Sequence, residues 1–233
     1  MSAELDFALK LADAADAVSL PRFGASDLRV DRKPDLTPVT DADRAVEQAL
    51  RDAVAERGDG FFGEEDGGDP DGVRWIVDPI DGTKNFTRGI PVWATLIALA
   101  RDDELVVGVV SAPALGRRWW AARGEGAYAN GEPIRVSAVS QLADAAVSAA
   151  LSSDLAALEN TTWHARGLGD FWQHVLVAEG ALDAAIDYPL EVWDYAALVP
   201  IVEEAGGHTG LTAEGQFVSS NGRIHREVLR TSA

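Results

Sequence analysis

The sequence contains no cysteine among its 233 residues. This absence excludes disulfide bonds, thiolate metal sites and a cysteine nucleophile, and it is compatible with a reducing compartment. No run of about 18 apolar residues occurs either, so no segment is predicted to span a bilayer. Acidic residues at Glu4, Asp6 and Asp13 interrupt the apolar segment that a signal peptide requires. We therefore expect a soluble, cytoplasmic chain.

Basic residues are scarce in this chain. Lysine and arginine number 20 against 38 aspartates and glutamates, which gives a formal net charge of −18. A surface this acidic repels nucleic-acid phosphates and anionic lipid headgroups, so neither nucleic acid nor a membrane is an expected partner. Hydrophobic residues make up 47% of the chain, an ordinary globular value, and the length suffices for a sizeable core.

Hydrophobic periodicity and turn residues predict both helices and strands. The predicted helices cover residues 3–19, 42–55, 170–180, 195–205 and 224–230. The predicted strands cover residues 61–62, 75–77, 93–100, 105–112, 117–122, 126–129, 145–150, 163–168 and 181–186. Residues 29–40 are a polar loop punctuated by proline, and Asn130-Gly131 marks a tight turn. The order indicates an α+β subdomain over residues 1–136 and an α/β subdomain over residues 137–233, with helices layered on sheets.

The stretch WIVDPIDGTKNF, residues 75–86, places Asp78 and Asp81 three positions apart where an apolar strand ends. Glu64 follows the apolar strand at 61–62, and Asp194 precedes a predicted helix. Two carboxylates about 4 Å apart repel by roughly 4 kcal/mol at an effective dielectric constant near 20. A site that gathers these four acids is therefore stable only if protons or cations neutralise it.

Oxygen ligands without cysteine or a nearby histidine select hard divalent cations. Mg²⁺ is the expected ion, with Mn²⁺ or Ca²⁺ as alternatives. Asp78 could bridge two ions, and a backbone carbonyl in the Pro79-Ile80 turn could complete a coordination shell. The pattern is that of a two-metal hydrolytic site.

Each acid also has a purely structural interpretation. Asp194 is a suitable N-cap for the helix that follows it, and Asp41 is a suitable N-cap for the helix that begins near residue 42. The run Glu64-Glu65-Asp66 alone would be a solvated turn. Asp78 resists such an interpretation, because an acid at the end of an apolar strand should be solvated or bound. Only the combination of motifs is specific.

Gly82 and Thr83 follow Asp81 directly and suggest an anion site. If a helix or tight turn begins there, their free backbone N–H groups can hold a phosphate. Gly82 permits a close approach of the backbone, and the Thr83 hydroxyl can orient a water. Acids beside an anion site are compatible only with metal ions between them. The inferred chemistry is metal-assisted attack of water on a phosphate ester.

Four segments resemble the inositol monophosphatase family: TPVTDAD at 37–43, GEE at 63–65, WIVDPIDGTKNF at 75–86 and WDYAALVPIVEEAGG at 193–207. The resemblance extends over essentially the whole chain in the right order and spacing. It implies a layered α-β-α-β-α sandwich, combining α+β and α/β halves, of the type shared with fructose-1,6-bisphosphatase. It also implies a Mg²⁺-dependent phosphomonoesterase that commonly forms a homodimer.

The resemblance assigns expected roles to individual residues. Five residues correspond to ligands of two or three Mg²⁺ ions, for which Mn²⁺ could substitute: Glu64, Asp78, Ile80 through its carbonyl, Asp81 and Asp194. Thr83 with Asp41 corresponds to the catalytic pair that activates the attacking water, assisted by Glu64. The N–H groups of Gly82 and Thr83 correspond to phosphate-binding groups.

Within the family, the chain is most similar to the actinobacterial type of histidinol-phosphate phosphatase, through KPDLTPVTDADRAVE at 33–47 and VVSAPALGRRWWAARGEGAY at 109–128. Such an enzyme releases L-histidinol and phosphate in histidine biosynthesis. Its substrate carries an ammonium group and an imidazole, so acids and aromatic faces are expected in the pocket. Asp81, Asp170 and Asp187 are the expected substrate-binding acids. Asp170 could instead cap the helix at 170–180, and Asp187 could be a loop acid.

Two other functions remain open from the sequence. The first is an inositol-1-phosphate or broad sugar-phosphate phosphatase of the same fold. The second is a non-catalytic regulatory or scaffold protein, which an intact set of acids argues against. Lys33 could close over a metal or the phosphate, or remain solvated. The four histidines are dispersed and lack metal-ligand spacing: His164, His174, His208 and His225.

Overall fold

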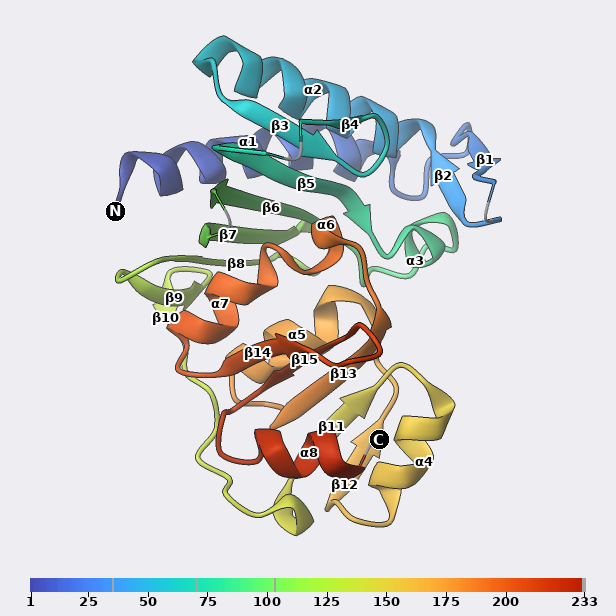
Figure 1. Ribbon diagram of the computed structural model, residues 1–233. Helices are drawn as coiled ribbons and strands as arrows, with labels where there is room; N and C mark the ends of the chain where they lie inside the picture. The colour runs from blue at the N-terminus through green and yellow to red at the C-terminus, as the bar shows by residue number, and fades with distance from the viewer. Residues whose placement is uncertain (35, 70, 103, 232–233) are drawn as a thin grey trace.

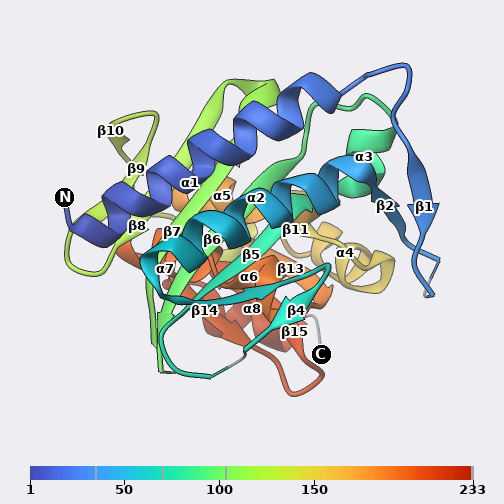
Figure 2. The same cartoon turned by 90° about the horizontal axis from the view of Figure 1, so that it is seen from above.

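The computed structural model describes residues 1–34, 36–69, 71–102 and 104–231. Two long helices, α1 (Ala3–Ser19) and α2 (Asp41–Arg57), lie side by side over one face of a large sheet (Figures 1 and 2). Apolar residues at helical spacing, such as Leu11 and Leu50, are buried against the sheet residue Trp75. Both helices were predicted from this periodicity, and they form the outer layer above the sheet.

The large sheet has eight strands in the order β10-β9-β8-β7-β6-β5-β3-β4. Their bounds are β3 (Gly60–Gly63), β4 (Gly67–Gly68), β5 (Arg74–Asp81), β6 (Ala94–Arg101), β7 (Glu104–Ala112), β8 (Arg117–Ala122), β9 (Gly126–Ala129) and β10 (Glu132–Pro133). Among the described strands of this sheet, β3 and β5 pair in parallel and the other neighbours are antiparallel. Asn130 and Gly131 have φ values of 48° and 91°, which confirms the tight turn predicted between β9 and β10.

A five-stranded sheet lies below the large one, in the order β12-β11-β13-β15-β14 (Figure 1). Its strands are β11 (Ala146–Ala149), β12 (His164–Arg166), β13 (Ala184–Pro189), β14 (His208–Leu211) and β15 (Gln216–Ser220). Helices α5 (Asp170–Ala178), α6 (Val192–Tyr195) and α7 (Leu198–Glu204) fill the space between the sheets, and α4 (Ser152–Glu159) and α8 (His225–Thr231) cover the outer face. The five layers confirm the predicted α-β-α-β-α sandwich.

Several element boundaries differ from the sequence-based prediction. The 29–40 segment, predicted as a loop, contains an antiparallel pair, β1 (Val30–Arg32) and β2 (Pro38–Thr40). The helix predicted at 195–205 is divided into α6 and α7, because the ring of Pro200 clashes with an uninterrupted helix and favours a first turn. The helix α4 and the strands β14 and β15 were not predicted, because these short elements lack a long periodic pattern. The single-turn helix α3 (Thr83–Thr87) lacks one as well.

The predicted subdomain boundary at 136/137 falls between the two sheets. The large sheet ends at Pro133 and the small one begins at Ala146. The largest hydrophobic cluster nevertheless draws on both halves, through residues such as Val110 and Phe171. The division into two subdomains therefore stays a prediction. The last two residues of the predicted second subdomain, 232–233, lie outside the described part of the chain. Within the described residues, every helix is too short or too polar to cross a membrane.

Gly108 of β7 sets how closely the middle helices approach the large sheet. A methyl group there would lie 2.1 Å from the carbonyl oxygen of Ala197, which links α6 to α7. We expect Gly108→Ala to lower the free energy of unfolding by about 3 kcal/mol, because backbone must move to remove the overlap. Urea unfolding measures this loss. Gly210→Ala is the matched control, since a methyl group on that strand residue meets no atom within 4 Å; equal losses in both would contradict the packing argument.

Candidate active site

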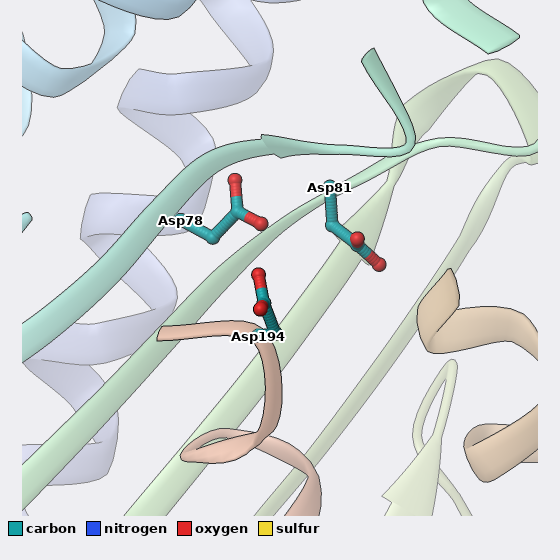
Figure 3. A group of neighbouring side chains, drawn as sticks. All are labelled: Asp78, Asp81 and Asp194. Carbon is teal, nitrogen blue, oxygen red and sulfur yellow. The ribbon is translucent and has the colours of Figure 1, made fainter. Parts of the chain in front are cut away.

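Three carboxylates converge where the large sheet meets the middle helices. Asp78 and Asp81 come from β5 and Asp194 from α6, and one oxygen of each lies within 4.8 Å of the others. Figure 3 shows the carboxylates of Asp78 and Asp194 turned toward each other, with the Asp81 side chain beside them. The ring of Trp193 packs 5.6 Å from that of Phe62 on β3, which fixes α6 against the sheet. The convergence predicted for these three residues is therefore present.

A β-bulge explains how Asp78 and Asp81 reach the same side of the sheet. Residues three apart in a regular strand face opposite sides. In β5 the register slips between Asp78, opposite Leu96, and Asp81, opposite Ala94. Pro79 occupies the bulge, where a missing N–H disturbs no regular ladder bond. The strand was predicted to end at Val77, but it continues to Asp81 and carries both acids.

Burial of these acids disfavours their charged forms. Desolvation raises the pKa of Asp78 well above its ordinary value, and the charges of Glu64, Asp81 and Asp194 add to the shift. Desolvation followed by repulsion from Asp170 likewise raises the pKa of Asp81. Burial raises the pKa of Asp194 to about 7, against a hydrogen bond from the Glu191 amide that lowers it. The cluster is therefore unfavourable as three anions unless a cation lies among them.

A cavity of about 520 Å³ contains this cluster. The residues predicted to bind metal and phosphate all line it: Glu64, Asp78, Ile80, Asp81, Gly82, Thr83 and Asp194. Gly82 has a φ of 82°, and a methyl group on it would lie 3.1 Å from the Val92 carbonyl oxygen, so glycine suits this turn. Gly82 and Thr83 begin the short helix α3, as the sequence suggested.

The structure does not bring Asp41 to Thr83, contrary to the prediction from the sequence. Asp41 is the first residue of α2 and pairs with Arg22 at 2.9 Å. Asp43 instead lies 3.3 Å from the Thr83 hydroxyl through its Oδ1 atom. Thr40, and not Asp41, is the N-cap of α2, and Asp43 completes a capping box with it. An acid of the TDAD segment therefore does lie beside Thr83, but it is Asp43, two residues after the predicted Asp41.

The N-cap interpretations of the other acids are also corrected. Glu191 is the N-cap of α6, and Asp194 is its third residue, accepting a hydrogen bond from the Glu191 amide at 2.9 Å. Gly169 is the N-cap of α5. Asp170 follows it with a φ of 50°, a left-handed conformation that is costly outside glycine. Asp187 belongs to strand β13 and is 1% exposed, so it is not a loop acid.

Asp170 and Asp187 both face the acidic cluster. Together with Asp81 and Asp194 they line a small, partly open cavity that adjoins the larger one. Asp170 accepts a hydrogen bond from Asn85 at 3.2 Å. Burial raises the pKa of Asp170, and the Asp187 charge adds to the shift. The two acids predicted to bind substrate are thus placed beside those predicted to bind metal.

Three further residues of this region were not assigned a definite role from the sequence. Lys33 is not solvated, because its ammonium lies 2.6 Å from Glu64 and 2.7 Å from Glu65. Glu47 of α2 accepts hydrogen bonds from the Glu65 and Asp66 amides and so holds the turn that carries Glu64. His174 lines the small cavity, although the four histidines are dispersed along the chain. All three contacts join segments far apart in sequence.

A cluster of carboxylates beside a Gly-Thr turn that can bind an anion suits metal-assisted hydrolysis of a phosphate ester. The model of the inositol monophosphatase family matches residues 1–230. The chain belongs to the inositol monophosphatase family, and it is accordingly a phosphatase. The family assignment agrees with the resemblance carried by the four motifs.

Curated and solved relatives support this assignment over the full length. The chain is 52% identical to the histidinol-phosphatase of Mycobacterium tuberculosis, over 97% of this chain and 96% of that protein. It is 45% identical to the histidinol-phosphatase of Streptomyces coelicolor, over 97% and 95%. A solved IMPase of Thermotoga maritima is 31% identical and superimposes with a TM-score of 0.91, over 99% of this chain and 97% of that one.

Proposed function

We propose that this protein hydrolyses L-histidinol phosphate to L-histidinol and inorganic phosphate. The observation that carries the proposal is the pair Asp170 and Asp187, which line one small cavity beside the acidic cluster. A substrate with a cationic amine complements two buried acids, whereas a neutral polyol does not neutralise them. The names of the relatives that are 52% and 45% identical point to the same substrate.

The residues of the cluster fit a divalent cation. The buried Asp78 and the half-buried Asp81 and Asp194 have carboxylate oxygens within 4.8 Å of one another, and among the described residues no lysine or arginine forms an ion pair with these three acids. Glu64, Asp78, the Ile80 carbonyl, Asp81 and Asp194 would hold the ions, which we propose to be two or three Mg²⁺, replaceable by Mn²⁺. Bound cations would supply positive charge to the phosphate and lower the pKa of a nearby water.

The chain's own residues can orient the attacking water. The Thr83 hydroxyl has one proton, which it can donate to Asp43 Oδ1 at 3.3 Å or to the Ile80 carbonyl at 2.9 Å. When it donates to Asp43, the Thr83 oxygen can accept a hydrogen bond from water. Glu64 lies in the same cavity and can accept the water's second proton. The N–H groups of Gly82 and Thr83 would bind the phosphate oxygens.

A substrate panel at fixed Mg²⁺ tests the proposed reaction. Phosphate release is measured from L-histidinol phosphate, inositol-1-phosphate and glucose-1-phosphate at equal concentration. We expect kcat/KM for L-histidinol phosphate to exceed the other two by at least about a hundred-fold, since a buried unpaired acid penalises a neutral substrate. Preference for inositol phosphate would replace the proposal with the inositol-phosphatase alternative. Absence of turnover on all three would favour the non-catalytic alternative.

The affinity for Mg²⁺ is expected to fall as the pH drops below about 7. Burial raises the pKa of Asp194 to about 7, so this carboxyl is mostly protonated below that pH. A cation that binds there must then displace the proton, which weakens its binding. This residue alone predicts a weakening of about fivefold between pH 7 and pH 6. Raised pKa values at Asp78 and Asp81 make the dependence steeper. Calorimetric titration with Mg²⁺ at pH 6, 7 and 8 measures it; one constant affinity over this range would contradict the burial argument.

We also propose a homodimer in the cytoplasm. The likeness to the inositol monophosphatase family, whose model matches residues 1–230, supports the homodimer. The absence of cysteine, which is compatible with a reducing compartment, supports the cytoplasmic location. Sedimentation velocity at micromolar concentration tests the oligomeric state.

A further inference from the structure

Three neighbouring strands of the small sheet end on the side of the acidic cluster. β12, β11 and β13 run in parallel, with Arg166 opposite Ser148 and Ser148 opposite Ala185. The segment after Arg166 reaches Asp170 within four residues, and β13 carries Asp187 two residues after Ala185. The positions of both acids therefore depend on how these strand ends are held.

A chain of hydrogen bonds joins the three strand ends inside the protein. The Leu168 amide donates to the Ser148 hydroxyl oxygen at 3.1 Å, and this hydroxyl donates to Gln173 Oε1 at 2.7 Å. The Gln173 side-chain nitrogen donates to Asp187 Oδ2 at 2.7 Å. Ser148 and Gln173 are fully buried and Asp187 nearly so, which shields these bonds from water. We call these four residues, Leu168, Ser148, Gln173 and Asp187, the buried relay.

The donors of the buried relay all point toward Asp187. Ser148 has a single proton, which it gives to Gln173 while its oxygen accepts from Leu168. Gln173 must turn its NH₂ group toward Asp187, because its carbonyl oxygen and a carboxylate would both be acceptors. Aligned bonds of this kind polarise one another, and breaking one leaves buried groups unpaired. We therefore expect the relay to act as one unit.

The relay also holds the segment that carries Asp170. This residue has a φ of 50°, a costly conformation that persists only where surrounding bonds fix the backbone. One such bond is that of the Leu168 amide to Ser148, two residues earlier. Another is that of the Phe171 amide to Asp81, one residue later. Ser148 thus bears on the positions of both acids, whereas Gln173 bears on that of Asp187.

A buried glutamine bonded to an aspartate can also serve stability alone, and the same sheet offers such a pair. Gln216 of β15 donates to Asp154 Oδ2 at 2.7 Å, and both residues are buried. Asp154 belongs to α4 and lines neither cavity of the acidic site. The two pairs match in chemistry, distance and burial. They differ in that Asp187 lines a cavity beside the cluster.

We propose that Ser148 and Gln173 are positioning residues for substrate selection, and that the buried relay fixes Asp170 and Asp187 relative to each other. This inference rests on the proposed function, in which both acids contact the amine-bearing substrate, and adds the residues that hold the acids in place. Ser148 and Gln173 line neither cavity, so both act through the acids. A displacement of about 1 Å in such a site can cost about a hundred-fold in rate.

Ser148→Ala and Gln173→Met test the proposal, because each removes bonds of the relay with little change in side-chain volume. L-histidinol phosphate is compared with the phosphate ester of imidazolyl-propanol, which lacks the amine, at fixed Mg²⁺. We expect the ratio of the two kcat/KM values to fall by about tenfold in each variant. The loss should lie mainly in a higher KM for the amine-bearing ester, because the proposed metal ligands stay in place. An unchanged ratio in both variants would overturn the proposal.

The double variant tests whether the relay acts as one unit. If Ser148 acts through Gln173 and the Leu168 segment together, the ratio in the double variant should stay within about threefold of that in the more affected single variant. A loss equal to the product of the two single losses would mean that the residues act independently. That result would contradict the relay.

Gln216→Met is the matched control for Gln173→Met. Both variants break a buried bond from glutamine to aspartate of the same length, so both should lower the midpoint of thermal unfolding. Gln216→Met should nevertheless keep the substrate preference of the unaltered protein. If it reduced the preference as much as Gln173→Met does, the role of Gln173 would be one of stability, and the proposal would fail.

Failure of the proposed function would show in the unaltered protein, as a kcat/KM for L-histidinol phosphate no higher than that for the amine-free ester. The three variants would then be measured on the ester that the unaltered protein prefers. A KM raised in Ser148→Ala and Gln173→Met, but not in Gln216→Met, would still support the relay. A KM unchanged in all three would overturn it.

Discussion

Replacing Asp78 by asparagine is expected to lower kcat/KM by at least about a thousand-fold, because metal charge contributes several kcal/mol to the transition state. Asp78 is 2% exposed, and one of its oxygens lies within 4.8 Å of an oxygen of both Asp81 and Asp194. Its Oδ1 atom accepts from the Ile80 amide at 2.9 Å, a bond that the asparagine oxygen can keep. The fold should therefore survive, and an unchanged circular dichroism spectrum is the expected control.

The same substitution should stabilise the metal-free protein. A carboxyl whose pKa is raised by folding contributes stability below its unfolded pKa and loses it as the pH rises. An uncharged amide in place of this carboxyl would remove that loss, so we expect a gain of about 1 kcal/mol at pH 8 and almost none at pH 4. Thermal unfolding in EDTA at the two pH values measures it. Near-normal turnover, or destabilisation at pH 8, would refute the assignment of Asp78 to a cation site.

Replacing Asp43 by asparagine is expected to lower kcat by about 10²–10³-fold, since it removes the acceptor that orients Thr83. The Asp43 Oδ2 atom accepts from the Thr40 amide and hydroxyl, so an asparagine that keeps those bonds turns its NH₂ group toward Thr83. Thr83→Val should cost a similar factor, and the double variant little more, because the two residues act as one unit.

Asp41→Asn is the matched control for this pair. It lies two residues earlier on the same helix and pairs with Arg22 at the surface, so its turnover should stay within about threefold of the unaltered protein. If Asp41→Asn instead abolished activity while Asp43→Asn did not, the geometry seen at Thr83 would not be the catalytic one.

Long periodic elements could be predicted from the sequence because each pattern is local. The helix at 3–19 and the strands at 117–122 and 126–129 agree with the structure at both ends. The interior of β5 could not be predicted in the same way. Pro79 reads as a strand end, and only pairing with β6 shows that it lies in a bulge.

The site residues could be predicted where a motif specifies the residue itself. They could not be predicted where the exact start of a helix decides which of two acids faces the site. Asp41 and Asp43 lie in one four-residue segment, but two helical positions rotate a side chain by about 200°. Which acid faces Thr83 depends on whether Thr40 or Asp41 caps the helix, and the capping box decides for Thr40. Lys33 contacts Glu64, 31 residues away in sequence, and His174 contacts Ser219, 45 residues away. No local sequence pattern predicts contacts over such separations.

Anomalous diffraction from crystals grown with Mn²⁺ tests the central claim most directly. Acids from β5 and α6 are proposed to hold divalent cations, and Mn²⁺ scatters anomalously where the lighter Mg²⁺ does not. We predict at least one anomalous peak within about 2.0–2.6 Å of oxygens from both Asp78 and Asp194. Saturating Mn²⁺ without a peak among Asp78, Asp81 and Asp194 would contradict the account.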